Sequence, residues 1–182
     1  MLGNRCGKRL NGYVPEYVVF DLETTGISCE KDRIVEISAV KVVNGIVVEE
    51  FSELVNPECR IPYYASRVNG ITDEMVKDAR TFDKVLPDFL GFIGDSILVG
   101  HNIQSFDMKF LYRECKKLYG ETLANDYIDT LYYSRMKVPK LIHHRLTDMA
   151  EYFNISTVGA HRALNDCRMN QEVFEMLSRI GR

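Results

Sequence analysis

The chain has 182 residues, of which 46% are hydrophobic and 27% are charged, the composition of an ordinary globular protein with one substantial core. A net charge of -3 and a pI near 5.8 argue against a protein that coats nucleic acid by bulk electrostatics. They do not exclude nucleic acid, because cations held in a carboxylate cluster would cancel part of the negative charge.

Residues 1–14 are polar and lack an apolar segment, so we expect a loose N-terminal tail and not a signal peptide, followed by a single domain over residues 15–182. No apolar stretch approaches the roughly 20 residues needed to cross a bilayer, so no membrane partner is expected. The five cysteines show no C-x-x-C pairing, which predicts neither a disulfide framework nor a zinc site, and favours a reducing cytoplasm.

The first predicted strand lies in the stretch 17–26, where an apolar run is followed by turn residues. Side chains alternate between the two faces of a strand, so Asp21 and Glu23 share one face near its end. When two carboxylates lie so near each other in a half-buried place, they cannot both stay ionised unless a cation lies between them. The strand therefore predicts a divalent metal site.

Two further β-rich runs, 33–43 and 46–55, are separated only by Asn44-Gly45, a strong signal for an antiparallel hairpin. Prolines at 57 and 62 end this pattern, and Thr72 is predicted to cap a short helix after a turn at Asn69-Gly70. Apolar residues spaced three and four apart predict an amphipathic helix over 82–93.

The second half of the chain alternates short strands and helices. Strands are expected at 97–100 and 127–128, and helices at 105–119, 146–153 and 163–180. Asp129 is expected to cap a further helix that runs through Met136. Strands gathered early with helices alternating later predict an α/β fold, in which a mixed sheet is covered by helices on both faces.

Two more acids are expected at the ends of elements. Asp107 falls in the first turn of its helix, where the macrodipole favours a charged carboxylate that can bind a hard cation. Asp166 lies near the start of the last helix, five residues after His161. Five residues on one helix would separate the two side chains by about 140°, so they converge only if His161 lies on the preceding loop. An imidazole on a loop beside a metal site suits a general base.

Each of these signals has a simpler explanation when it is taken alone. An Asp at a helix start is commonly a cap, and a loop His is commonly solvated. It is the combination of motifs, in this order, that is informative. The chain resembles the DEDDh 3′-5′ exonucleases, and most of all the proofreading epsilon-type subunit or exonuclease domain of bacterial DNA polymerase III, in three ordered motifs: Asp21-x-Glu23-Thr24-Thr25-Gly26, His101-Asn102-x-x-x-Phe106-Asp107 and His161-x-Ala163-Leu164-x-Asp166.

The resemblance implies an RNase H-like fold with a central mixed sheet of about five strands, and makes the domain over residues 15–182 an exonuclease domain. It implies that two Mg²⁺ or Mn²⁺ ions are held by Asp21, Glu23, Asp107 and Asp166, with His161 as general base. A sister branch of the family carries Tyr four residues before the last Asp, where this chain has Arg162, which places the chain in the His branch.

The implied activity is hydrolysis of DNA from a single-stranded 3′ end, releasing nucleoside monophosphates during proofreading, with a replicative polymerase subunit as partner. The backbone N–H groups of Thr24 and Thr25 are expected to meet the terminal 3′ hydroxyl. Ile71 and Phe106 are expected to pack on the last bases, although Phe106 is equally suited to the core. The full set of expected substrate-binding residues is Thr24, Thr25, Asn69, Ile71, Asn102 and Phe106.

Two other functions remain open from the sequence. RNA 3′ exonucleases similar to ribonuclease T or oligoribonuclease share the five catalytic positions, so RNA is an alternative substrate. A polymerase-associated interaction module is the alternative outside enzymes. A stretch without an acid is either a solvated loop or a rim that binds the nucleic-acid strand; it contains Arg135, Lys137, Lys140 and Arg145, with His143 and His144 among them.

Overall fold

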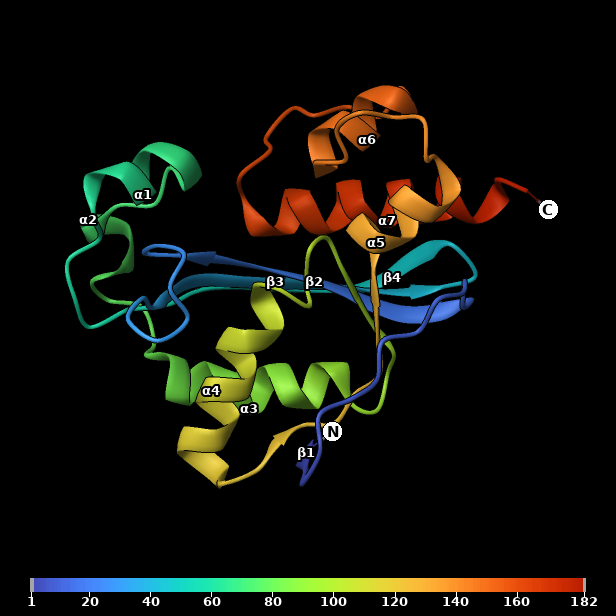
Figure 1. Ribbon diagram of the computed structural model, residues 1–182. Helices are drawn as coiled ribbons and strands as arrows, with labels where there is room; N and C mark the ends of the chain where they lie inside the picture. The colour runs from blue at the N-terminus through green and yellow to red at the C-terminus, as the bar shows by residue number, and fades with distance from the viewer. Residues whose placement is uncertain (1, 182) are drawn as a thin grey trace.

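The computed structural model describes residues 2–181 (Figure 1), and the remaining residues, 1 and 182, lie outside that description. Its centre is a five-stranded sheet in the order β4-β3-β2-β5-β7. The long strands β2, β3 and β4 pair antiparallel, whereas β5 and β7 add parallel to β2. The strands are β2 (Glu16–Thr24), β3 (Ile34–Val43), β4 (Ile46–Leu54), β5 (Leu98–Gly100) and β7 (Tyr127–Asp129).

The hairpin between β3 and β4 forms where the sequence predicts it. Asn44 and Gly45 both have positive φ, 52° and 78°, and Val43 pairs directly with Ile46. A two-residue turn of this hand matches the twist of the two strands, and Asn-Gly adopts it at little cost.

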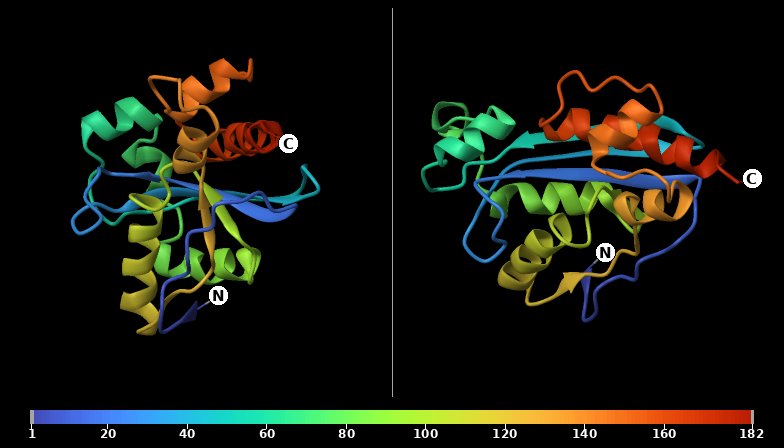
Figure 2. Two further views of the ribbon diagram at one scale, coloured as in Figure 1. Left: turned by 45° about the vertical axis from the view of Figure 1, so that its right-hand side comes forward. Right: turned by 45° about the horizontal axis from the view of Figure 1, so that its top comes forward.

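Helices cover both faces of the sheet, which confirms the predicted α/β architecture (Figures 1 and 2). One face carries α3 (Phe82–Ile93) and α4 (Asp107–Tyr119). The other face carries α5 (Thr130–Lys137), α6 (Leu146–Tyr152) and α7 (Ala163–Arg179). Two short helices, α1 (Tyr63–Asn69) and α2 (Asp73–Val76), lie beyond the end of the sheet at which β2 stops.

Side chains of β2 alternate between two cores, one on each face of the sheet. Phe20 packs edge-on against Phe89 of α3, at a ring separation of 5.6 Å. Tyr17 packs against Phe174 of α7 at 5.0 Å. Because Asp21 and Glu23 continue the Tyr17 face, the strand delivers them beneath the N-terminal end of α7.

Residues 2–14 are not the loose tail that the sequence predicts. Strand β1 (Leu2–Gly3) pairs with β6 (Thr122–Leu123), and the chain then runs beside β7, where the Leu10 N–H donates to the Tyr127 carbonyl at 2.7 Å. A Cβ on Gly7 would lie 1.8 Å from the Asn125 carbonyl oxygen. The glycine therefore permits close packing, and the segment satisfies backbone groups along the outer side of β7.

The structure also contains a helix that the sequence pattern does not predict. Helix α1 occupies residues 63–69, where two prolines suggest only irregular chain. It buries only Ala65 and Asn69, so it lacks the apolar stripe that a helix prediction needs. Gly70 ends it with φ 72°.

Two further properties concern the chain as a whole. Within residues 2–181, no helix has both the length and the apolar character that a membrane span requires. All five cysteines are unpaired: Cys6, Cys29, Cys59, Cys115 and Cys167.

Candidate functional site

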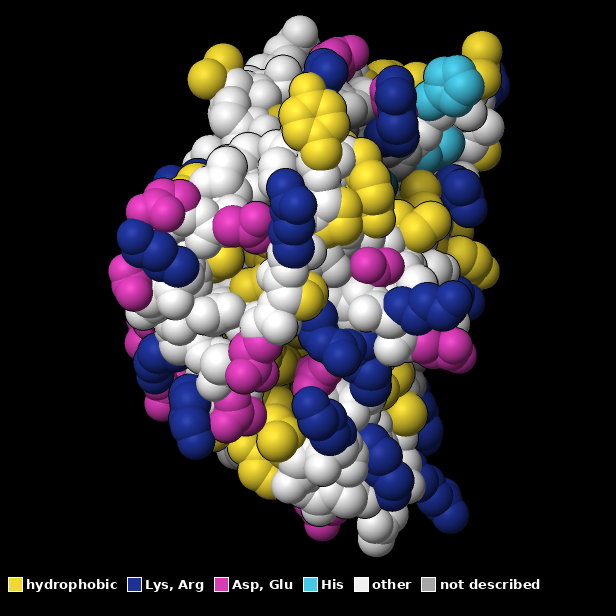
Figure 3. All heavy atoms as spheres, turned by 90° about the vertical axis from the view of Figure 1, so that its left-hand side faces the viewer, with side chains coloured by type: hydrophobic (Ala, Val, Ile, Leu, Met, Phe, Trp, Pro, Cys, Tyr) yellow, Lys and Arg dark blue, Asp and Glu magenta, His cyan; other side chains and the backbone are white. Residues whose placement is uncertain are grey.

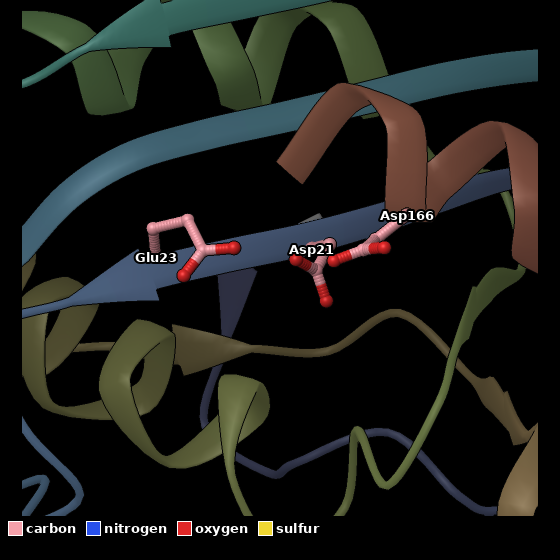
Figure 4. Close-up of side chains that lie close together, drawn as sticks. All are labelled: Asp21, Glu23 and Asp166. Atoms are coloured by element: carbon pink, nitrogen blue, oxygen red, sulfur yellow. The ribbon is translucent and has the colours of Figure 1, made fainter. Parts of the chain in front are cut away.

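Three of the predicted acids meet between β2 and α7. Asp21 and Glu23 come from the strand, and Asp166 projects toward Asp21 from the first turn of the helix (Figure 4). Each offers a carboxylate oxygen, and these three atoms lie within 4.8 Å of one another. Oxygen atoms at this spacing from half-buried carboxylates form a site that a hard divalent cation can occupy.

The fourth predicted acid, Asp107, contacts the same strand from the start of α4. It is the first residue of α4 and is only 3% exposed. Its Oδ1 accepts the backbone N–H of Leu22 at 3.1 Å, between Asp21 and Glu23 in the chain. The structure therefore brings acids from three distant parts of the sequence to one end of β2.

Burial raises the pKa values of these four acids, and neighbouring negative charges add to the shifts. Burial raises the pKa of Asp21 well above its ordinary range, and the charges of Asp107 and Glu23 raise it further. Burial raises the pKa of Glu23 to about 8, with contributions from Asp166 and Glu36, and burial raises that of Asp107 to about 7. Burial likewise raises the pKa of Asp166. Carboxylates that resist ionisation together are those that a divalent cation would stabilise most.

His161 lies in the turn before α7, as its spacing from Asp166 requires. Its φ is 67°, a left-handed conformation that is uncommon for a residue with a side chain. Its backbone N–H donates to Asp166 Oδ2 at 3.0 Å. The residue itself is exposed, so the imidazole is held beside the acids by its backbone and remains open to water.

Glu36 is a part of the site that the sequence did not reveal. It lies on β3 directly opposite Glu23 and is 3% exposed. Its carboxylate accepts two hydrogen bonds from Arg162, at 2.8 and 3.2 Å, and a third from the Ala163 N–H at 3.1 Å. It thus fixes the start of α7, where His161 and Asp166 are carried. The signal that could have identified it is a single acid inside a largely apolar strand.

Asp129 is a second support that sequence reasoning read only as a helix cap. It does cap α5, accepting the N–H groups of Leu131 and Tyr132. Its carboxylate also accepts the N–H of Asn102 at 3.1 Å and that of Gln104 at 3.2 Å. One buried carboxylate therefore holds the loop that leads into Asp107.

The structure changes the reading of two expected substrate contacts. Ile71 is fully buried in a small core with Val35 and Val76, so it has no surface to offer a base. The Thr25 N–H already donates to the Arg33 carbonyl at 2.8 Å, so it is not free for a 3′ hydroxyl. The Ile71 side chain is occupied by apolar packing and the Thr25 N–H by a loop hydrogen bond. Both residues therefore shape the loops around the site instead of contacting substrate.

The other expected contacts lie where a substrate can reach, or support such a place. Thr24 is mostly buried, and its carbonyl accepts a hydrogen bond from Asn69 Nδ2 at 3.4 Å, which joins α1 to the end of β2. Phe106 is half-buried against Phe110 and lines a hollow of about 220 Å³. Asn102 lines a separate, larger hollow.

Comparisons with known proteins agree on one family. A family model described as "Exonuclease" matches residues 18–174. The chain is 41% identical over 170 residues to a DNA polymerase III PolC-type from Caldanaerobacter subterraneus, covering 91% of this chain but 12% of that protein. It is 40% identical over 158 residues to the DNA polymerase III subunit epsilon of Aquifex aeolicus, covering 87% of this chain and 78% of that protein. A solved structure of Exonuclease X in complex with 5′ overhanging duplex DNA aligns with a TM-score of 0.75 and 26% identity, covering 91% of this chain and 92% of that one.

Proposed function

Because the chain belongs to the exonuclease family, we propose that it hydrolyses DNA phosphodiester bonds from a single-stranded 3′ end and releases nucleoside monophosphates. Its mixed five-stranded sheet with helices on both faces is the RNase H-like fold of that family. The observation that carries the proposal is the convergence of Asp21, Glu23 and Asp166, with Asp107 bonded to the strand between the first two.

The residues present fit a pair of divalent cations, Mg²⁺ or Mn²⁺. Four carboxylates supply only oxygen ligands, which these ions prefer. Burial, with added repulsion from neighbouring acids, raises the pKa of each carboxyl, and a bound cation would favour the ionised forms. When bound, two such ions make water a stronger acid and stabilise charge on the leaving oxygen of a phosphodiester.

The chain's own residues then have distinct tasks. Asp21, Glu23, Asp107 and Asp166 would hold the cations and so fix where the scissile phosphate lies. His161 would accept the proton of the attacking water, since its side chain is exposed beside Asp166 and its backbone is anchored there. Phe106 would contact a terminal base across the hollow that it lines.

Proofreading during DNA replication is the biological setting that we propose. The relatives named as polymerase III proteins support this role, although the chain spans 12% of the PolC-type relative and 78% of the epsilon subunit. Association with a replicative polymerase subunit is part of the same proposal. We also propose a cytoplasmic location, which the unpaired cysteines support.

Digestion of matched 3′-labelled and 5′-labelled DNA and RNA oligonucleotides, with Mg²⁺, Mn²⁺ or a chelator, tests the proposal. We expect a ladder of products shortened from the 3′ end, faster on DNA, and no cleavage in the chelator. Faster digestion of RNA would make the chain an exoribonuclease. An Asp21→Asn variant is the control for contaminating nuclease. Absence of cleavage by the unaltered chain under every condition would leave only an interaction role.

A further inference from the structure

A second hollow lies beside the site, on the side of Asn102. It has a volume of about 400 Å³ and no Asp or Glu in its lining. This size falls in the range of pockets that hold a nucleotide-sized group, and exceeds what a single ion needs. Its lining comprises His101, Asn102, Leu131, Arg135, Ile142, His143, His144, Arg145 and Leu146.

The positive charge of the hollow rests mainly on Arg135. This exposed residue of α5 forms no ion pair with any acid among residues 2–181. Arg145 is partly neutralised, because Asp148 accepts two hydrogen bonds from its guanidinium at 2.8 and 3.0 Å. His101 contributes no charge near neutral pH, since burial lowers its pKa to about 4.

The structure separates the cations of the basic stretch, for which the sequence leaves open a solvated loop or a strand-binding rim. Lys137 turns away, with its Nζ donating to the Ile180 carbonyl at 2.8 Å. Lys140 lines a neighbouring hollow together with Asp148 and Glu151. Only Arg135 and Arg145 of the four cations remain in the hollow beside Asn102. Figure 3 shows histidine side chains at the upper right of the face at which β2 ends, with Lys and Arg side chains near them.

One loop of the chain links the lining of the hollow to the acidic site. Asn102 lines the hollow, and Asp107, five residues later, contacts β2. Asp129 holds this loop by accepting hydrogen bonds from the N–H groups of Asn102 and Gln104. Ile142, which is 87% exposed, adds an apolar surface at the mouth of the hollow.

We propose that this hollow binds one internal backbone phosphate of the nucleic-acid strand, on the 5′ side of the bond that is cleaved, with Arg135 as its principal ligand. The proposal rests on the proposed function and adds a second contact point to it. A guanidinium without an acidic partner, polar groups from Asn102 and His143, and an apolar wall together suit a phosphodiester with its attached sugar and base. The contact would hold a strand in place between successive cleavages.

A variant and a substrate change, made together, test the proposal. The variant is Arg135→Ala, and the substrates are single-stranded octamers in which one internal phosphate at a time is a neutral methylphosphonate. For the unaltered chain, we expect KM to rise about 10-fold at one internal position, the size of one lost charge-assisted hydrogen bond of about 1.4 kcal/mol. The KM of Arg135→Ala should be about 10-fold higher on the unmodified octamer. It should not rise further when methylphosphonate replaces the phosphate at that same position.

Three further measurements make the test specific. The p-nitrophenyl ester of thymidine 5′-monophosphate is too short to reach the hollow, so the ratio of KM for the octamer to KM for the ester should rise about 10-fold in Arg135→Ala. The salt dependence of octamer binding should lose a slope of about 0.7, the value for one phosphate on a single strand. Arg135→Lys should restore part of the affinity, since it keeps the charge. Lys140→Ala, the matched control, should have the same KM for the octamer and the same salt dependence of binding as the unaltered chain.

Two outcomes would overturn the inference while leaving the nuclease proposal intact. One is a rise in the KM of Arg135→Ala that is equally large for the ester and for the octamer. The other is a rise in KM for the octamer that is equally large in Arg135→Ala and in Lys140→Ala, which would indicate diffuse charge attraction. Should the unaltered chain cleave nothing, octamer binding measured by fluorescence anisotropy still decides whether Arg135 contacts one particular phosphate.

Discussion

His161 is the residue whose proposed task is easiest to separate from those of its neighbours. Its side chain is exposed, and the backbone alone bonds to Asp166, so His161→Ala keeps the hydrogen bond that positions the acids. We expect kcat for DNA cleavage to fall about 10² to 10⁴-fold, the usual contribution of a general base, while Mn²⁺ binding persists. Titration with Mn²⁺ by calorimetry, beside single-turnover cleavage, measures both quantities.

Asp21→Asn supplies the contrast for that experiment. It removes a carboxylate from the centre of the acid cluster, so both Mn²⁺ affinity and cleavage should be lost. A His161→Ala protein that cut DNA at the unaltered rate would remove His161 from the mechanism.

The pair formed by Glu36 and Arg162 makes an asymmetric prediction for stability. Arg162 is 43% exposed and can turn to water, whereas Glu36 is 3% exposed and cannot. Arg162→Ala therefore leaves a buried charge beside Glu23 and should lower the free energy of unfolding by about 3 kcal/mol. Glu36→Gln keeps a neutral acceptor for the Ala163 N–H and should cost about 1.5 kcal/mol.

Urea unfolding of the two single variants and the double variant measures this coupling. The double variant should be less destabilised than the sum of the single variants, because it leaves no unpaired buried charge. Strict additivity would mean that the two side chains do not stabilise each other in solution.

At the scale of single residues, sequence reasoning works where a residue belongs to an ordered motif. It selects Asp21, Glu23, Asp107 and Asp166, and in the structure three of them converge while Asp107 bonds to the strand between the first two. It misses Glu36, whose partners lie on α7 at the far end of the chain. It misassigns Ile71, because whether an apolar residue after a turn faces solvent or core depends on packing that spacing does not encode.

Among the elements, the N-terminal segment offers the clearest test of a structural correction. Removing the first ten residues would strip the hydrogen bonds along Tyr127 and uncover the apolar surface beneath Leu2 and Leu10. We expect the free energy of unfolding to fall by about 2 to 4 kcal/mol, from the lost hydrogen bonds and buried apolar area together. Urea titrations of the full chain and the shortened chain, fitted with one common slope of unfolding free energy against urea concentration, measure the change.

Arg9→Ala is the matched control within that segment. It removes only the hydrogen bond to Gln104 and the contact of the guanidinium with the Tyr132 ring, at 3.8 Å, so it should cost less than about 1 kcal/mol. If removal of the whole segment left stability unchanged, the segment would be the loose tail that its composition suggests.

Element prediction succeeds where periodicity is strong and fails where it is absent. The β3–β4 hairpin and the helix α3 follow directly from Asn44-Gly45 and from apolar spacing. Strand β1 is too short to carry a pattern, since it has only two residues. Its existence depends on β6, and no local feature of the sequence reports that distant partner.

For the whole molecule, the raised pKa values of the acids predict how stability depends on pH. Burial raises the pKa of Glu23 from 4.5 to about 8 and that of Asp107 from 3.8 to about 7. Between about pH 4 and pH 8 the folded chain therefore binds more protons than the unfolded chain. It follows that the free energy of unfolding of metal-free protein falls as pH rises through this window.

Divalent cations should reverse that loss. Mg²⁺ at 100 times its Kd adds about 2.7 kcal/mol, provided that it binds only the folded state. Thermal unfolding from pH 4.5 to pH 8.5, with chelator or with Mg²⁺, measures both effects, and Glu23→Gln should flatten the pH dependence in chelator. A melting temperature that changes with neither pH nor Mg²⁺ would contradict the idea of an unneutralised acid cluster.

The separation in sequence between Asp21 and Asp166 has a consequence for synthesis on the ribosome. The β2–β3–β4 meander uses only neighbouring stretches and can form early, whereas α7 packs on it only after nearly all of this chain has been translated. In the proposed function, a nascent or prematurely terminated polypeptide carries Asp21 and Glu23 without Asp166 and so has no assembled cutting centre. Nuclease activity would then begin only once translation has passed α7, which would spare the cell's DNA from damage by incomplete products.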